Sequence, residues 1–332
     1  MDKVLVIQTA FIGDAILGTA LLEKLHEKYP NAKIDYLVRN GNQSLFTNHP
    51  FLNEVLVWDK KGSKYLELFS TLKEIRSRKY DAVYNVQRYL ASGILTAFSE
   101  ANNKIGYKNN PLSSRFTKSV EHRFGTGFEN VHEVNRVVDL LEENATQVNP
   151  KLYPTEGDFG SILKYTDKPF VTIAPASVWF TKQLPVDKWV ELINQIPYKT
   201  AIYLIGAKSD AAIVAEIQEK ARRKVVDLSG ALKLLETAAL MKSAIMNYAN
   251  DSAPVHLASA VNAPVTEVFC STIPELGFTP LSDNSHIIQS KEQMDCRPCG
   301  MHGKSRCPKG HFKCAQSIDV NELVQVLSQS QG

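Results

Sequence analysis

Two patterns of apolar and polar positions alternate along this chain: one is typical of buried strands and the other of helices. Short apolar runs, the first at 4–8, have the length of buried strands, while apolar residues from Ile16 to Leu25 recur at helical spacing. Pro30 then ends this helical pattern. Strands and helices that alternate in this way are typical of a parallel sheet covered by helices, so the sequence predicts an α/β fold.

The same alternation starts again near residue 170, which divides the chain into two similar halves. In the first half we expect further strands at 34–38, 55–58 and 81–86, and helices at 66–76 and 91–99. In the second half we expect strands at 170–174, 201–205, 225–228, 245–249 and 265–269, and helices at 186–196, 209–221, 234–242, 254–261 and 320–327. The sequence therefore predicts two doubly wound, Rossmann-like domains.

The two halves are separated by a stretch with prolines, glycines and charges but no clear periodicity, which is typical of a linker. We expect a first domain over residues 1–155, a linker over 156–168 and a second domain over 169–332. Two domains are also the usual outcome for a chain of 332 residues. Because such sheets bind ligands at the carboxyl ends of their strands, we expect a ligand in the cleft between the domains.

Composition narrows the class of protein. The 44% hydrophobic and 22% charged residues are ordinary for a globular protein, and no apolar stretch approaches the roughly 20 residues of a membrane span. The first residues lack a secretory signal, so we expect a cytoplasmic protein. A net charge of +3 is too small to imply a nucleic-acid partner. Two interpretations fit the basic residues that are concentrated in the first half. They form either an ordinary solvated surface or a face that contacts phosphorylated sugars or lipid headgroups. These residues are Lys60, Lys61, Lys64, Arg76, Arg78, Lys79, Lys104, Lys108, Arg115, Lys118 and Arg123.

Two predicted turns carry residue types that hold phosphate. Each turn follows an expected strand, and together they contain Ser177, Thr181 and Lys182 in the first turn and Asp251, Ser252 and His256 in the second. A helix N-terminus offers unpaired N–H groups and a partial positive charge, so an anion binds there readily. The hydroxyl residues are equally able to serve as plain helix caps. The combination with Lys182 and His256 favours a nucleotide diphosphate held from two strand ends of one sheet.

Asp14 is the candidate catalytic base of the first half. It follows Gly13, in a loop after the first strand that begins a helix. Its carboxylate is suited to accept a proton from a hydroxyl that attacks an activated carbon, which is general base catalysis. The alternative is a capping or first-turn aspartate that only stabilises the helix dipole.

Four segments resemble one family in sequence and order. They are residues 7–16 (IQTAFIGDAI), 175–182 (PASVWFTK), 227–230 (DLSG) and 250–258 (NDSAPVHLA). Together they look like the ADP-heptose:lipopolysaccharide heptosyltransferases of glycosyltransferase family 9, over nearly the whole chain. The resemblance implies a GT-B fold with two Rossmann-like domains facing a cleft. It also implies inverting, metal-independent transfer of heptose from ADP-heptose to the lipopolysaccharide inner core, with Kdo- or heptosyl-Kdo-lipid A as acceptor. The protein would then touch the inner face of the cytoplasmic membrane transiently, as a peripheral enzyme.

The resemblance also suggests roles for single residues. Asp14 is similar in position to the family's general base and Lys182 to its diphosphate contact, and the donor-binding loop corresponds to Asp251, Ser252 and His256. Glu236 resembles an acid that holds the ADP ribose, although a lone helical glutamate is ordinarily just solvated. The chain departs from the family at Pro175 and Ala253, where glycine is common, which leaves the fine donor specificity open.

Cysteines form a separate cluster near the C-terminus. Cys296, Cys299, Cys307 and Cys314 lie in a loop over 296–314 together with two histidines. In a cytosolic protein this density indicates a metal rather than disulfides, and four thiolates are able to enclose a structural zinc ion. An iron–sulfur cluster uses similar spacing, and reduced thiols without a ligand are the third option. We expect no cofactor to be required for catalysis.

Other classes of function fit the sequence less well. A related glycosyltransferase that uses a different sugar nucleotide would share all the features above. A non-catalytic module that binds nucleotides or nucleic acid needs aromatic residues among its lysines, but the tyrosines here suit core packing better. A dehydrogenase is excluded because Gly-x-Gly-x-x-Gly is missing after the first strand.

Overall fold

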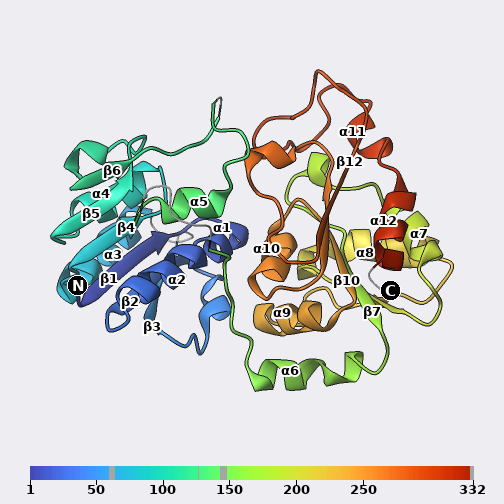
Figure 1. Cartoon of the computed structure of the whole chain (residues 1–332), viewed down its shortest axis with the longest axis horizontal. Coiled ribbons are helices and arrows are strands. Elements are labelled where there is room, and N and C mark those ends of the chain that lie inside the picture. Colours follow the sequence, from blue (N-terminus) through green and yellow to red (C-terminus); the bar gives the residue numbers. More distant parts are fainter. Residues whose placement is uncertain (60–63, 126, 143–147, 330–332) are drawn as a thin grey trace. The chain divides into compact units, whose positions relative to one another are not determined.

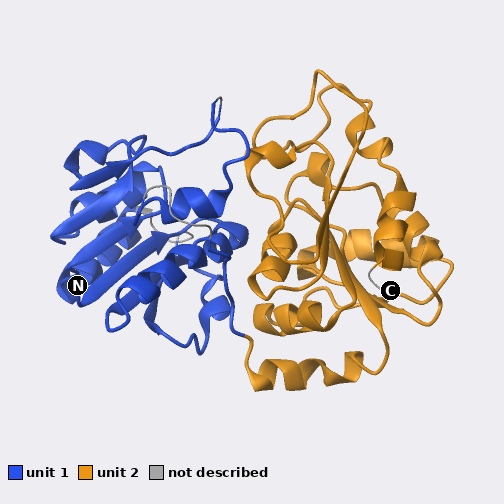
Figure 2. Ribbon diagram, viewed as in Figure 1, with its two compact units in different colours: residues 1–153 blue, residues 154–332 orange. Residues whose placement is uncertain are grey.

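The computed structural model describes residues 1–59, 64–125, 127–142 and 148–329. It divides into two compact units, unit 1 over Met1–Tyr153 and unit 2 over Pro154–Gly332 (Figure 2). Each unit contains a six-stranded parallel sheet with helices packed around it (Figure 1). The prediction of two Rossmann-like, doubly wound domains is therefore confirmed.

Unit 1 is built around a central strand whose apolar residues are completely buried. Its sheet has the order β3-β2-β1-β4-β5-β6. The chain passes through β1 (Lys3–Gln8), α1 (Ile12–Leu17), α2 (Thr19–Lys28), β2 (Lys33–Arg39), β3 (Leu52–Trp58), α3 (Lys64–Arg78), β4 (Ala82–Asn85), α4 (Leu90–Ala97), β5 (Asn103–Tyr107), β6 (Lys118–Val120) and α5 (Glu133–Val138). The sequence predicts a loop at Gly13 and Asp14, but α1 begins at Ile12, so both residues lie in its first turn.

Unit 2 repeats this topology. Counted from its own first strand, its sheet order β12-β11-β10-β7-β8-β9 is the order of unit 1 read in reverse. The main elements are β7 (Phe170–Ala174), α7 (Val186–Gln195), β8 (Ala201–Leu204), α8 (Ala211–Lys220), β9 (Val226–Asp227), α9 (Leu234–Ser243), β10 (Met246–Asn250), α10 (Ala253–Ala260), β11 (Val265–Phe269), β12 (Ser285–Gln289), α11 (Lys313–Gln316) and α12 (Val320–Gln329). The chain reverses direction across the sheet between β7 and β10, which is where folds of this type bind ligands.

The segment predicted as an irregular linker contains a helix, α6 (Glu156–Ile162). A capping box starts it: the hydroxyl of Thr155 accepts from the backbone N–H of Asp158 at 3.2 Å, and the carboxylate of Asp158 accepts from the N–H of Thr155 at 2.7 Å. The helix packs against α9. Its two glycines hide the helical pattern, whereas the Thr-x-x-Asp signal is present in the sequence.

The C-terminal helix α12 belongs to the core of unit 2. Its buried residues Val320, Leu323 and Leu327 pack in the same cluster as Trp189 of α7. The hydroxyl of Tyr248 on β10 donates a hydrogen bond to the carbonyl of Leu323 at 3.0 Å. The end of the described chain is therefore fixed against the central strands that carry the candidate site.

None of the helices in the described part of the chain has both the length and the apolar character needed to cross a bilayer. Of the basic residues noted above, Lys60 and Lys61 lie outside the described residues. Several of the others have acidic neighbours in the form of the pairs Arg76–Glu100, Arg78–Glu54, Lys108–Glu121 and Arg123–Asp139. Because their charges are paired, these residues are better explained as an ordinary solvated surface than as a face that contacts anionic groups.

One half-buried histidine, His49, and one buried histidine, His122, predict that unit 1 is sensitive to acid. Burial lowers the pKa of His49 to about 4, with a further contribution from His26, and lowers that of His122 to about 3, with contributions from Arg88 and Arg136. In the unfolded chain both titrate near about 6.5, so below that pH the unfolded chain binds protons that the folded chain does not. The free energy of unfolding should therefore fall as the pH drops from about 6.5 toward 4, by at most about 1.4 kcal/mol per pH unit for each histidine.

Urea unfolding at pH 7, 6 and 5 measures this slope in the wild type and in His122→Gln. The variant keeps a polar side chain but cannot titrate, so its stability should depend less steeply on pH whatever its stability at pH 7. His286→Gln is the control, because His286 lies half-buried on β12 of unit 2, away from His49 and His122 in unit 1. Equal slopes for the wild type and His122→Gln would contradict the prediction.

Candidate functional site

The two predicted phosphate turns lie side by side in unit 2. Strands β7 and β10 are parallel neighbours, so the turns that follow them leave the sheet at the same edge. Asn250, at the end of β10, holds the two turns together. Its side-chain oxygen accepts from the N–H of Leu184 at 2.9 Å, and its side-chain nitrogen donates to the carbonyl of Pro175 at 2.8 Å. Because Asn250 is fully buried, these bonds fix the relative position of the turns.

Lys182 and Asp251 form an ion pair at this edge. The Nζ atom of Lys182 lies 2.7 Å from Oδ2 of Asp251, and their side chains are only 14% and 8% exposed. The same carboxylate oxygen accepts a hydrogen bond from the hydroxyl of Thr272 at 2.5 Å. A largely buried lysine is thus held in place by a fixed carboxylate, close to the N-terminus of α10.

Ser252 stands at the N-cap position of α10 but does not cap the helix. Its hydroxyl instead donates to the carbonyl of Asn250 at 3.0 Å. The capping alternative for Ser252 is therefore wrong, and the helix presents its first turn without a side-chain cap from this residue. His256 lies one turn further along α10, is 5% exposed, and has its ring 6.4 Å from that of Phe278.

Thr181 and Ser177 differ in their surroundings. The buried hydroxyl of Thr181 accepts hydrogen bonds from Ser271 at 2.9 Å and from the backbone N–H of Lys304 at 2.8 Å. The Thr181 hydroxyl therefore links the turn to Ser271 and to Lys304. Ser177 is half-buried, and within the described part of the chain its hydroxyl has no hydrogen-bond partner. Of the two hydroxyls, that of Ser177 is the one available to a ligand.

Glu236 lies in the first turn of helix α9. One of its oxygens accepts from the backbone N–H of Lys233 at 2.8 Å, and the other lies 3.7 Å from the Nζ atom of that lysine. Its side chain is only 13% exposed, so the expectation of a merely solvated glutamate is wrong. The structure gives Glu236 a role in capping the helix.

Glu267 is a buried acid that the motifs in the sequence do not single out. It lies on β11, and neither carboxyl oxygen has a hydrogen-bond partner among the described residues. Burial raises the pKa of Glu267 well above its usual value, the nearby charge of Asp251 raises it further, and Lys182 opposes this change. Burial therefore favours the neutral form of Glu267 beside the Lys182–Asp251 pair. Its sequence signal is a single acid inside an apolar strand.

In unit 1, Asp14 lies half-buried in the first turn of α1. Burial raises the pKa of Tyr36, and the charge of Asp14 raises it further. Burial also raises the pKa of Glu133 against the opposing charge of Arg136, and Asp14 adds to this rise. Asp14 is therefore close enough to both groups to influence them. Its position agrees with the first-turn alternative and leaves the role of base open.

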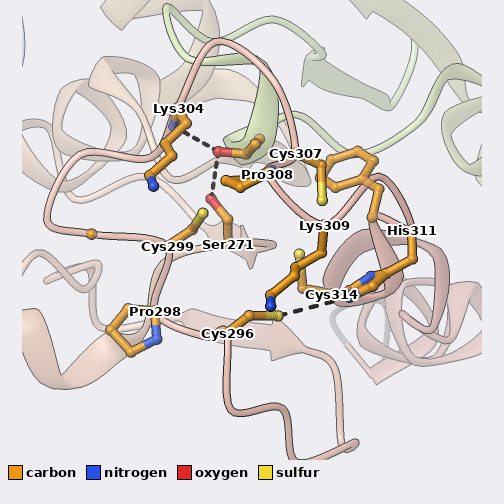
Figure 3. A pocket seen from close by; sticks show the side chains of 13 residues that line it. Ser271, Cys296, Pro298, Cys299, Lys304, Cys307, Pro308, Lys309, His311 and Cys314 are labelled. Carbon is orange, nitrogen blue, oxygen red and sulfur yellow. Dashed lines mark hydrogen bonds between the residues drawn. The ribbon is translucent and has the colours of Figure 1, made fainter.

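The four cysteines of the loop line one cavity of about 240 Å³ (Figure 3). His311 lies at its wall, with Nε2 3.9 Å from the sulfur of Cys296. Within the residues that the structure describes, no group of three or more His, Cys, Asp or Glu side chains is already arranged to hold a metal ion. The metal site therefore stays a prediction, with these four cysteines as its ligands.

Two of these cysteines have shifted pKa values. Burial raises the pKa of Cys314 to about 11; Arg297 opposes this change, while Cys307, Cys296 and Cys299 add to it. Partial burial raises the pKa of Cys307, but hydrogen bonds from the backbone of residues 309–312 outweigh it and lower the pKa below its usual value. The charge of each nearby thiolate thus affects the pKa of Cys314, so these cysteines are close enough to influence one another.

Comparison with known proteins identifies the family. The sequence model of glycosyltransferase family 9 (heptosyltransferase) matches residues 68–307 of this chain. The chain belongs to glycosyltransferase family 9. It is similar to lipopolysaccharide heptosyltransferase 3 of Escherichia coli, with 28% identity over 293 residues that cover 82% of this chain and 85% of the relative. It is thus a glycosyltransferase.

Solved family 9 structures share its fold. The glycosyl transferase family 9 protein of Veillonella parvula superimposes with a TM-score of 0.84 at 19% identity, covering 99% of this chain and 97% of the other. Escherichia coli heptosyltransferase WaaC with ADP superimposes with a TM-score of 0.76 at 19% identity, covering 99% of each chain. These likenesses confirm the GT-B type of fold. The family 9 match includes both turns of unit 2 but begins after Asp14.

Proposed function

We propose that this family 9 glycosyltransferase transfers heptose from ADP-heptose to the inner core of lipopolysaccharide. The Lys182–Asp251 pair carries the proposal, because it places a fixed cation beside the uncapped first turn of α10. A diphosphate needs this combination of positive charge and N–H donors. The name of the Escherichia coli relative supports lipopolysaccharide as the acceptor, and the solved structure of WaaC with ADP supports the nucleotide.

The residues of unit 2 would divide the binding of the donor. Lys182 contacts the diphosphate, and the hydroxyls of Ser177 and Ser252 lie on the two turns that surround it. Thr181 positions Lys182 rather than touching the donor, because its hydroxyl is buried and already bonded. Asp251 holds Lys182 in place, and His256 supports the turn from within α10.

The ribose contact proposed for Glu236 competes with the hydrogen bonds that this residue already makes. To bind a ribose hydroxyl, Glu236 must share oxygens that now bond to Lys233. One carboxylate is able to accept several hydrogen bonds, so capping of α9 and ribose binding are compatible. Glu236 therefore stays a proposed donor contact.

We propose inversion at the anomeric carbon. A hydroxyl of the acceptor attacks this carbon from the face opposite to ADP, and Asp14 accepts the hydroxyl proton as the new carbon–oxygen bond forms. The bond between the carbon and the diphosphate oxygen breaks, and ADP leaves with the electron pair. Lys182 and the N–H groups of α10 stabilise the negative charge that develops on the diphosphate. These protein groups supply the positive charge, so the proposed transfer requires no metal ion.

The acceptor determines where the enzyme acts. Lipid A anchors the inner core in the membrane, so we propose peripheral, transient contact with the cytoplasmic face, and no nucleic-acid partner. Kdo-lipid A and heptosyl-Kdo-lipid A are the two candidate acceptors. A different sugar nucleotide is the second candidate for the donor, and it would use the same two turns.

Purified protein incubated with ADP-heptose and each acceptor tests the proposal. We expect release of ADP and a gain of one heptose in the mass of one of the two acceptors. Competition by ADP, UDP and GDP identifies the nucleotide, and ADP should compete best. Absence of transfer to both acceptors, together with stronger competition by UDP or GDP, would overturn the proposal.

A further inference from the structure

The cysteine loop, residues 296–314, contains two tight turns that present sulfur atoms. In the first turn, two residues separate Cys296 from Cys299. In the second, the N–H of Gly310 donates to the carbonyl of Cys307 at 3.2 Å, and Gly310 has a φ of +73° that favours glycine. Both turns place their cysteines at the wall of the same cavity. Thiolates are the form of cysteine that binds metals.

The four cysteine side chains line the same cavity. Cys314 comes from α11 and joins the three cysteines of the turns at the wall of the cavity. Figure 3 shows the side chains of Cys296 and His311 turned toward each other, with Cys314 between the turns. Four thiolates are a complete ligand set for a tetrahedral zinc or iron ion. Binding one ion requires the side chains around this cavity to draw together.

The charges around the cavity also fit a thiolate centre. Four thiolates around a divalent ion leave a net charge of about −2. Partly buried Arg297 donates hydrogen bonds to the carbonyls of Thr272 and Phe269 and to the side-chain oxygen of Gln289. Arg297 stands between Cys296 and Cys299 in the chain, so a fixed positive charge lies beside the proposed thiolates.

The loop is fastened directly to the donor turn. The N–H of Thr181 donates to the carbonyl of Lys304 at 3.0 Å, and the N–H of Lys304 returns a bond to the hydroxyl of Thr181. Gly303 has a φ of +77°, and a Cβ there would lie 2.9 Å from Cγ of Lys182. The N–H of Cys299 donates to the carbonyl of Ser271 at 2.7 Å. The position of the loop therefore determines how closely Lys182 is packed.

We propose that Cys296, Cys299, Cys307 and Cys314 bind one zinc or iron ion, which holds the cysteine loop against Thr181 and Lys182. Binding releases the protons of the thiols and needs no redox partner. The ion is structural and touches no substrate. Its effect on the donor turn rests on the proposed function, whereas its presence does not.

Elemental analysis of the full-length protein, produced in medium supplemented with zinc and iron, tests the site. We expect about one ion per chain, and close to none in Cys296→Ser and Cys307→Ser. Cys270→Ala is the matched control and should keep its ion, because Cys270 lies in the core of unit 2. Iron would give the visible absorption of iron bound to thiolates, whereas zinc would give none. A protein without metal, also after incubation with zinc under reducing conditions, would overturn the site.

Calorimetric titration with ADP tests the effect on the donor turn. Removal of the ion from the wild type with a chelator should weaken ADP binding about tenfold, and renewed zinc or iron should restore it. This arm does not depend on the folding of a variant. Unchanged affinity after complete removal would overturn the coupling but not the site. If the metal-loaded wild type bound no ADP, the proposed function and the coupling would both fail, while the metal content would still decide the site.

Discussion

Asp14→Asn should nearly abolish heptosyl transfer while leaving the affinity for ADP unchanged. The substitution keeps the size and polarity of the side chain but removes the group proposed to accept the proton of the acceptor. A positioned general base contributes roughly 10²- to 10⁴-fold to the rate, so kcat should fall within that range. Asp14 lies in unit 1 and the nucleotide residues lie in unit 2, so the binding of ADP alone should not respond. Steady-state kinetics at saturating ADP-heptose, together with calorimetry, measures both quantities.

Asp187→Asn is the matched control for this experiment. Asp187 also lies in the first turn of a helix, α7, but its partner is the exposed Lys220. Loss of a first-turn carboxylate costs about 0.3–1 kcal/mol of stability in either position, and only Asp14→Asn should lower kcat. If Asp14→Asn kept kcat within threefold of the wild type, Asp14 would be only a first-turn aspartate.

Lys182→Met should weaken ADP binding by roughly 10²- to 10³-fold. The variant loses the cation that contacts the diphosphate, and it leaves the carboxylate of Asp251 largely buried beside the phosphates. Truncation of one member of a buried ion pair costs about 2–5 kcal/mol, and much of this is the penalty for the charge left behind. Calorimetry with ADP measures the loss directly.

A second substitution separates the two causes. Lys182→Met combined with Asp251→Asn removes the stranded charge, so this double variant should recover part of the lost affinity. Lys188→Met is the control, because Lys188 of α7 donates to the carbonyl of Ile318, away from the two turns. It should bind ADP within twofold of the wild type. Affinity for ADP within threefold of the wild type in Lys182→Met would exclude Lys182 as the diphosphate contact.

Most of the sheet could be predicted from the sequence because its central strands are continuous apolar runs. The missed strands β5, β6 and β12 lie toward the edges of their sheets, where exposed polar residues interrupt the apolar pattern. The helix α6 was missed for another reason. Gly157 and Gly160 weaken its pattern, so a local capping box and packing on α9 decide the conformation.

The site could be predicted only in part. The two turns were recognisable because the ends of parallel strands meet at one edge of a sheet, and the topology confirms that β7 and β10 are neighbours. The bonds of Thr181 to Ser271 and Lys304 were not predictable, because their partners lie 90 and 123 residues further along the chain. Such contacts follow from tertiary folding and have no local pattern.

The structure of the protein in complex with ADP tests the central claim most directly. We predict that the diphosphate lies at the carboxyl ends of β7 and β10, with an oxygen within hydrogen-bond distance of Nζ of Lys182 and another facing the first turn of α10. A diphosphate bound elsewhere on the protein, with the Lys182–Asp251 pair untouched, would contradict this account of donor binding.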